Sequence, residues 1–408
     1  MAGGKTITFS GLGQAGNLLD PHNWKHNVVP GVNDTAVITM NIGAPMTGVF
    51  SVNNMMLLGS ETITFGGTLN TAGIGACKGL MVCDGATAIF APGAVLNDGN
   101  VMIVGNEAAG TVLVTGAGAT HGVINTGHAN IGKHAAGTGV VTIDNGIWKD
   151  AGNAVIGDAG SGTLNVIDNG LVTVSGHLVM GRDTGASGKM TIASGGSVSV
   201  TGGVHLLGGA THGTAMVSVG AGSSLTAGDS LTIGTGDTLT LTGGAVTAGV
   251  TKGCIDVHAG AVISGFGTVA LKDGMAIDDD GLISATGGTL KLDANIHGTG
   301  AIEIGANSEA MLTGAKLGLS RISFMGAAGT LSLAHGAAVS ATISGFAVGD
   351  IIEMAGVDAV SFNPANNVLT LSDHGIQVDR LHLAGSFAGD TFAVHQSAIG
   401  AMISLQHP

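Results

Sequence analysis

A motif of two mostly apolar residues followed by glycine recurs through the middle of the chain and sets its period. The glycines of this motif are separated by 24 to 27 residues, and they are Gly105, Gly132, Gly157, Gly181, Gly208 and Gly234. Self-similarity at a period of this size is the signature of a repeat architecture, in which each repeat packs mainly on its two neighbours. The chain is therefore predicted to form a solenoid.

Each repeat contains three short segments rich in Val, Ile, Leu, Met and Thr, which favour strands. In the clearest copy, the segments 162–167, 171–174 and 177–180 are predicted strands, and Asp168-Asn169-Gly170 is the first turn. Asn and Gly tolerate positive φ at such corners. Three strands in about 25 residues describe one coil of a right-handed parallel β-helix, with apolar ladders inside and Thr, Ser, Asn and Asp facing water.

Two other fold classes are less consistent with this pattern. A β-sandwich pairs its strands in hairpins and needs no 25-residue register, and a helical protein would be destabilised by 74 glycines. We therefore expect an all-β chain with an N-terminal cap over residues 1–40, a parallel β-helix over 41–345 and a C-terminal β cap or interaction and secretion module over 346–408. Trp24 is expected to cover the first apolar end, and Phe387 and Phe392 the second.

Three parts of the chain carry a family resemblance. They are Asp20-Pro21-His22-Asn23-Trp24 with the following 28–38, the repeat 155–164, and the closing segments 343–346, 349–352 and 367–372. These stretches resemble bacterial autotransporter-like and haemagglutinin-like β-solenoid surface proteins, whose passengers carry adhesin-type repeats. The resemblance implies a secreted stalk or an adhesive passenger at the bacterial cell surface.

Charge and hydropathy exclude two classes of partner. The formal net charge is −14, with 13 Lys and Arg against 27 Asp and Glu, whereas nucleic-acid binding requires clustered basic residues. No apolar stretch approaches the roughly 18–20 residues that a membrane-spanning helix needs. The N-terminal residues also lack the basic and apolar regions of a cleaved signal peptide. We expect an extracellular or cell-surface protein exported without such a signal, with a cytoplasmic filament as the alternative.

Catalysis on a β-helix would need acidic residues on adjacent coils, together with basic and aromatic residues for a sugar substrate. The strongest acidic cluster is Asp278-Asp279-Asp280, which is interpreted as a solvated turn before Gly281. The chain has no Tyr, two Trp and only three scattered arginines. We expect no catalytic site and no enzymatic activity.

Four further motifs contain residue types that occur in binding sites. Gly228-Asp229 and Gly236-Asp237 resemble pieces of a calcium-binding repeat, but their spacing of 8 and their isolation favour ordinary turns. A metal site needs several converging ligands, and His121, His128 and His134 are interpreted as surface imidazoles. Cys77 and Cys83 are expected to be small buried residues. Gly4-Lys5-Thr6 matches only part of a phosphate-binding loop. No metal or cofactor is predicted.

The sequence thus predicts a structural, non-catalytic and glycine-rich β-solenoid. A low-charge repeat with strand edges at both ends is expected to self-assemble, end to end or laterally, into a filament, sheet or surface layer. The alternative is a secreted adhesin-type module that displays a recognition surface for a cell-surface polysaccharide or protein. A polysaccharide-processing enzyme is a distant third.

Overall fold

The computed structural model confirms the predicted architecture. It describes residues 4–73, 79–272, 275–396 and 400–407. The chain is all-β and forms a parallel β-solenoid of about 12 turns with about 24 residues per turn. It divides into two compact units, of which the first comprises Met1–Ser218 with Gly222–Leu225 and the second comprises Val219–Ala221 with Thr226–Pro408.

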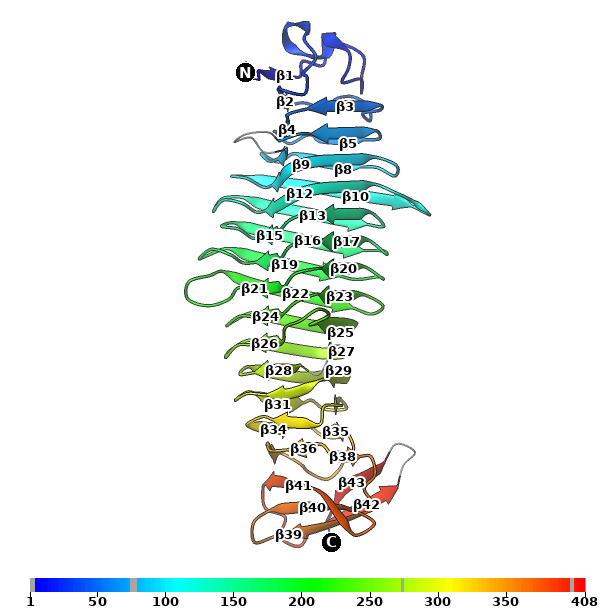
Figure 1. Cartoon of the computed structure of the whole chain (residues 1–408), viewed down its shortest axis with the longest axis vertical. Coiled ribbons are helices and arrows are strands. Elements are labelled where there is room, and N and C mark those ends of the chain that lie inside the picture. Colours follow the sequence, from blue (N-terminus) through cyan, green and yellow to red (C-terminus); the bar gives the residue numbers. More distant parts are fainter. Residues whose placement is uncertain (1–3, 74–78, 273–274, 397–399, 408) are drawn as a thin grey trace. The chain divides into compact units, whose positions relative to one another are not determined.

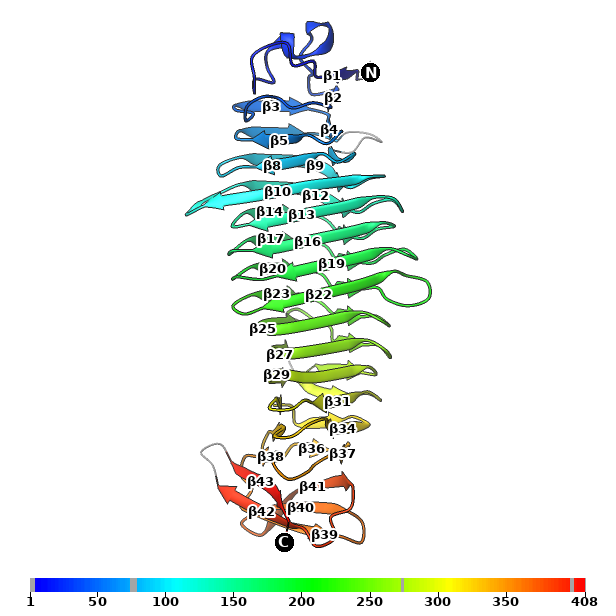
Figure 2. The same cartoon turned by 180° about the vertical axis from the view of Figure 1, so that it is seen from behind.

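The first unit contains strands β1 to β21 (Figures 1 and 2) and two short 3-10 helices. The helices are η1 (Pro21–Asn23) and η2 (Lys25–Asn27). The strands are β1 (Thr6–Thr8), β2 (Thr35–Ile38), β3 (Val49–Val52), β4 (Asn54–Leu57), β5 (Thr62–Phe65), β6 (Thr68–Thr71), β7 (Leu80–Val82), β8 (Thr87–Phe90), β9 (Val95–Val104), β10 (Ala109–Ala117), β11 (Thr120–His121), β12 (Val123–Ile131), β13 (Thr138–Asp144), β14 (Ile147–Asp150), β15 (Ala154–Ile156), β16 (Ser161–Ile167), β17 (Leu171–Val174), β18 (Leu178–Met180), β19 (Ser187–Ile192), β20 (Ser197–Val200) and β21 (Val204–Leu206).

The remaining strands follow the same chain order. The residues that separate the two units in the sequence fall within or next to β22 (Thr214–Gly220) and β23 (Ser224–Ala227). The second unit then contains β24 (Leu231–Ile233), β25 (Thr238–Ala248), β26 (Ile255–Val257), β27 (Val262–Leu271), β28 (Ala276–Asp279), β29 (Leu282–Asp293), β30 (Asn295–His297), β31 (Ala301–Ile304), β32 (Glu309–Leu312), β33 (Lys316–Gly318), β34 (Arg321–Phe324), β35 (Thr330–Leu333), β36 (Ala338–Val339), β37 (Thr342–Ser344), β38 (Ile351–Met354), β39 (Ala359–Asn363), β40 (Val368–Asp373), β41 (Ile376–Ala384), β42 (Thr391–Gln396) and β43 (Ala401–Gln406).

One coil of the first unit shows why these residues form this fold. Strands β16, β17 and β18 pair in parallel with β19, β20 and β21 of the next coil. Between β16 and β17, Asp168 and Asn169 have φ of 50° and 65°, and the corner residue Gly157 has φ of 72°. A Cβ atom on Gly157 would lie 2.3 Å from the carbonyl oxygen of Ser187 in the next coil. Glycine is therefore required there by both backbone conformation and close coil stacking.

In-register pairing aligns like residues on successive coils. In the second unit, an isoleucine ladder runs through Ile263, Ile283, Ile302, Ile322 and Ile343, all of them fully buried. On the outside of the first unit, Asn97 Nδ2 donates to Asn70 Oδ1 and Asn125 Nδ2 donates to Asn97 Oδ1, each at 2.9 Å. The same register thus stacks the apolar interior and links polar side chains outside.

The solenoid pattern gives way to antiparallel pairing after β38. Strands β39, β40 and β41 form an antiparallel meander, and β42 pairs with β43. Both groups are joined to the solenoid, because β41 pairs in parallel with β37 and β43 pairs antiparallel with β38. Figure 2 shows these five strands, β39 to β43, following the last coils of the second unit. We call residues 359–407 the C-terminal module.

The buried ladders predict that substitutions at inward-facing and outward-facing residues of one strand change the free energy of unfolding by different amounts. Leu164→Ala removes a fully buried side chain from β16, and we expect it to lower the free energy of unfolding by about 2–5 kcal/mol. Thr163→Ala alters the adjacent, outward-facing residue and should change the free energy by no more than about 0.5 kcal/mol. Urea denaturation followed by circular dichroism measures both; equal losses would contradict the inward register.

Candidate functional site

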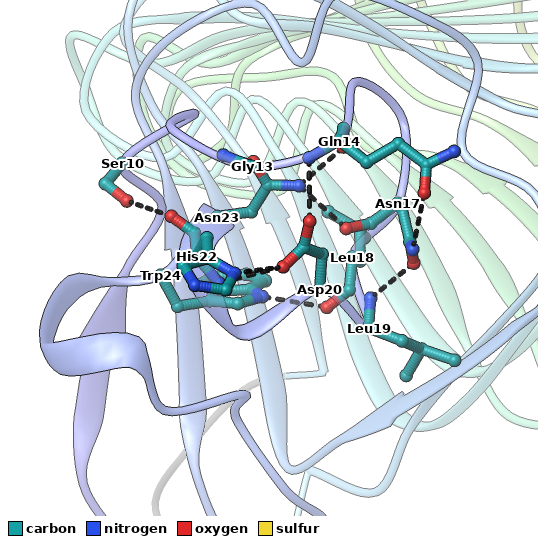
Figure 3. A network of polar contacts seen from close by, with 10 residues as sticks. All are labelled: Ser10, Gly13, Gln14, Asn17, Leu18, Leu19, Asp20, His22, Asn23 and Trp24. Atoms are coloured by element: carbon teal, nitrogen blue, oxygen red, sulfur yellow. Dashed lines mark hydrogen bonds and ion pairs between the residues drawn. The ribbon is translucent and has the colours of Figure 1, made fainter.

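The N-terminal segment forms a hydrogen-bond network around Asn23, which is almost fully buried. Asn23 Oδ1 accepts the backbone N–H of Gly13 at 2.8 Å, and its Nδ2 donates to the carbonyl oxygens of Gln14 and Asn17. The N–H groups of Gln14 and His22 donate to Asp20 and lower the pKa of that carboxyl. Figure 3 shows these bonds tying the loop between Ser10 and Leu19 to the η1 turn. This hydrogen-bond network fixes the segment that carries Trp24.

Trp24 covers the apolar interior of the first coils, as expected. Its ring is stacked on Phe50 at 5.7 Å between centroids and meets Phe9 edge-on at 5.4 Å. Its indole Nε1–H donates to the carbonyl oxygen of Leu18 at 2.8 Å. This bond satisfies the one polar group of the side chain, which would otherwise be buried without an acceptor.

A small cavity remains beside the first strand. It has a volume of about 240 Å³ and is bounded by β1 on one side and by the segment 25–28 on the other. Its lining includes three basic side chains, those of Lys5, Lys25 and His26, together with Val28. We call this cavity, with β1 and the segment 25–28, the N-terminal slot.

Large exposed apolar side chains are frequent around the same region. Within the first 50 residues, those exposed are Leu12, Leu19, Val28, Val32, Met40 and Val49. Strand β3, which carries Val49, pairs with β6 on one edge, and among the described residues its other edge has no strand partner. Exposed apolar side chains next to unpaired strand edges are characteristic of association surfaces.

The C-terminal module contains a second cavity, of about 570 Å³, lined by aromatic rings. Phe362 lies 4.7 Å from Phe392 and 5.5 Å from Phe387, measured between ring centroids. Asp390 also lines the cavity, and its Oδ1 bonds His407 Nδ1 at 2.6 Å. We call this cavity, between β39 and residues 387–392, the C-terminal cleft. Phe387 is buried and Phe392 partly buried, so both cover apolar surface here.

The acidic cluster Asp278-Asp279-Asp280 is not a solvated turn, which corrects the interpretation of the sequence. Asp278 and Asp279 belong to β28, and strand alternation turns Asp279 inward until it is 0% exposed. Burial, followed by the charges of Asp280 and Asp278, raises the pKa of Asp279 to about 7, although the N–H of Gly281 donates to it at 3.0 Å. Its Oδ2 meets no hydrogen-bond donor among the described residues.

The two Gly-Asp motifs lie in different environments. Asp229 accepts the hydroxyl of Thr251 at 2.8 Å, whereas Asp237 is buried at the start of β25. Within the described ranges, the side chains close enough to share a metal ion are Asp358, just before β39, Asp373, at the end of β40, and His374, in the turn that follows. His374 Nδ1 already bonds Asp373, and this bond raises the pKa of His374.

The three histidines are engaged separately with backbone groups. His121 Nδ1 donates to the carbonyl oxygen of Asn145 at 2.6 Å, and His128 Nδ1 accepts the N–H of Asn153 at 2.9 Å. The N–H of His134 bonds the carbonyl oxygen of Asn106. His121 lies in β11, His128 in β12 and His134 in the segment that follows β12, and within the described residues they form no group of shared metal ligands.

Cys83 is buried, and burial raises the pKa of its thiol to about 11, so it is not an activated nucleophile. Cys77 lies outside the described residues. In the motif Gly4-Lys5-Thr6, the N–H of Lys5 donates to Asp34 Oδ1 at 2.8 Å and Thr6 begins strand β1. A phosphate-binding loop would instead lead into a helix.

A buried polar ladder was not predicted from the sequence. Register places Thr71, Asp98, Thr126 and Asp150 at equivalent inward positions of successive coils. Thr126 donates to Asp150 Oδ2 at 2.6 Å and accepts the indole N–H of Trp148 at 2.9 Å. Burial raises the pKa of both aspartates. Only the alignment of coils shows that these residues, separated by 24 to 28 positions, form one column.

Comparison with known proteins assigns no family to this architecture. No protein-family model matches the sequence, and the search of curated proteins returns no significant match. Among the described residues, no helix has the length and hydropathy to cross a membrane. Any functional inference therefore depends on the geometry of this chain, above all on the N-terminal slot and the C-terminal cleft.

The inward carboxyl of Asp279 predicts a specific pH dependence of stability. Its native pKa of about 7 exceeds the ordinary value of 3.8, so the unfolded chain loses this proton first. The contribution to stability is then greatest in acid, falls as pH rises from about 4 to 7 and is constant above. Asp279→Asn removes this pH-dependent contribution. As pH rises from 4 to 8, the free energy of unfolding of the variant should therefore increase relative to that of wild type by on the order of 2–4 kcal/mol.

Urea denaturation at a series of pH values measures this difference. Asp278→Asn removes an exposed charge from the same strand, and its effect should be much smaller, because burial contributes more than the Asp278 charge to the raised pKa of Asp279. A pH-independent difference between Asp279→Asn and wild type would show that the Asp279 carboxyl is not held in the apolar interior.

Proposed function

We propose that this protein is a structural, non-catalytic β-solenoid that self-assembles into a filament, sheet or surface layer. The observation that carries the proposal is the N-terminal region, where β1 and β3 leave strand edges without partners among the described residues. An open edge offers backbone groups to any strand of suitable register, and natural proteins usually blunt such edges. Here the edges of β1 and β3 are only partly covered.

The exposed apolar side chains support the same proposal. Val49 is 59% exposed on β3 itself, and Leu12 is 84% exposed in the loop between Ser10 and Leu19. Burying such side chains against another molecule contributes roughly 25 cal/mol per Å² of apolar surface removed from water. Edge pairing supplies direction to the contact, and the apolar surface supplies much of its free energy.

A second candidate function is an adhesin-type binding module, and the C-terminal cleft favours it. Aromatic rings beside a carboxylate–imidazole pair can stack on the apolar face of a sugar ring and bond its hydroxyls. This role requires binding of a cell-surface polysaccharide by the isolated particle. Glycan-array screening of wild type and Phe362→Ala tests it, since a specific ligand should be retained by wild type and lost by the variant.

Self-assembly predicts that charge introduced at β3 reduces association. Val49→Lys places a cation on the edge strand, and we expect a loss of at least tenfold in the fraction of assembled material. Met216→Lys is the matched control, because Met216 is 56% exposed but lies far along the sequence. Sedimentation velocity over a concentration series measures both variants. Equal assembly of Val49→Lys and wild type would exclude the β3 edge as an association surface.

A further inference from the structure

The hydrogen bonds of β1 define which of its backbone groups are available. The N–H of Thr35 donates to the carbonyl oxygen of Lys5, and the N–H of Phe9 donates to that of Val37, each at 2.8 Å. Because backbone direction alternates along a strand, residues 5, 7 and 9 face β2. The N–H groups of Thr6 and Thr8 therefore point away from β2 and meet no acceptor among the described residues.

The segment that follows Trp24 bends away instead of covering this edge. An antiparallel bridge joins Phe9 to Trp24, but His26 and Asn27 then adopt positive φ of 63° and 53°. Two consecutive left-handed residues reverse the path of an extended chain. The N-terminal slot is the space left between this bend and β1, and the strand edge forms one of its walls.

Two lysines and a histidine line the slot, although the whole chain is acidic. Lys5, Lys25 and His26 line it, and no ion pair engages these three side chains in the described structure. The carboxylate of Asp34 accepts the N–H groups of Lys5 and Gly31 and is not among the residues that line the slot. An extended segment that enters the slot is therefore selected for negative charge as well as for strand conformation.

The C-terminal module has the complementary properties. Its strand β39 pairs with β40 on one edge, and its other edge has no strand partner among the described residues. Asp358 directly precedes β39 and is exposed, and Asp373 lies beside it. The backbone N–H of His374 donates to Asp358 and its Nδ1 bonds Asp373, so this cluster has two carboxylates to one imidazole. From residue 351 onward the acidic residues outnumber the basic ones, with Glu353, Asp358, Asp373, Asp379 and Asp390 against Arg380. The C-terminal cleft adjoins the same strand.

We propose that β1 of one copy pairs edge to edge with β39 of a second copy, with Lys5, Lys25 and His26 facing Asp358 and Asp373. This inference rests on the proposed self-assembly and names its interface. Pairing β1 with β1 would bring like charges together, which the slot disfavours. Because the two surfaces differ, the contact is heterologous, and repeating it generates an open filament or a closed ring instead of a two-fold dimer.

The first test removes one backbone donor from the β1 edge. Thr8→Pro deletes an N–H that points away from β2, a substitution that edge strands tolerate. Thr8→Ala keeps that N–H and is the matched control. In sedimentation velocity of the full-length protein, Thr8→Pro should lose assembly at least tenfold, whereas Thr8→Ala should assemble like wild type. Circular dichroism melts verify that both variants are folded.

The second test identifies the partner surface. Asp358→Lys reverses the charge next to β39 and should abolish assembly alone, but it leaves β1 intact. Thr8→Pro leaves β39 intact. Mixing these two variants should therefore give discrete two-copy particles, because each retains one of the two complementary surfaces.

The outcomes separate this interface from the broader proposal. Filaments that form equally well in Thr8→Pro, or a mixture that remains monomeric, would overturn the β1–β39 contact while self-assembly stands. Equal loss in Thr8→Pro and Thr8→Ala would overturn the role of the backbone donor. Wild-type protein that stays monomeric at all concentrations would overturn the proposed function itself.

Discussion

Strand register between successive coils is the constraint on which the rest of this structure depends. Pairing a strand with its equivalent in the next coil satisfies the backbone and, at the same time, aligns side chains of one kind. The column from Ile263 to Ile343 shows the result inside the second unit. A slip of one residue would turn each buried side chain in the strand outward. Corners such as Gly157, where a Cβ has no room, keep the coils at this spacing.

The repeated part of the fold could be predicted from the sequence because its signals recur. Asp168-Asn169-Gly170 and its counterparts mark turns, and the apolar segments between them have the right length for strands. Residues that occur once give no such signal. Asp279 resembles a turn residue in composition, and only its place in β28 turns it inward. The contact of Phe362 with Phe392 likewise depends on how β39 and β42 meet in the C-terminal module, which has no period.

A stack of coils leaves the strand edges of its first coil open, and the caps determine what those edges do. Trp24 protects the apolar interior of the first unit, but the bend at His26 and Asn27 exposes β1. The cap of this chain thus covers the apolar interior but does not cover the strand edge. The C-terminal module is arranged in the same way, since Phe387 is buried while β39 keeps an edge without a strand partner in the described structure. This arrangement is the physical basis for the proposed self-assembly.

Electron microscopy of the purified full-length protein near neutral pH tests this account most directly. We expect fibres or layers with a regular repeat, whose abundance rises with protein concentration, because open edges of complementary charge associate by mass action. Discrete single particles across the whole concentration range would contradict the account and would leave the C-terminal cleft, as a ligand-binding site, the feature to pursue.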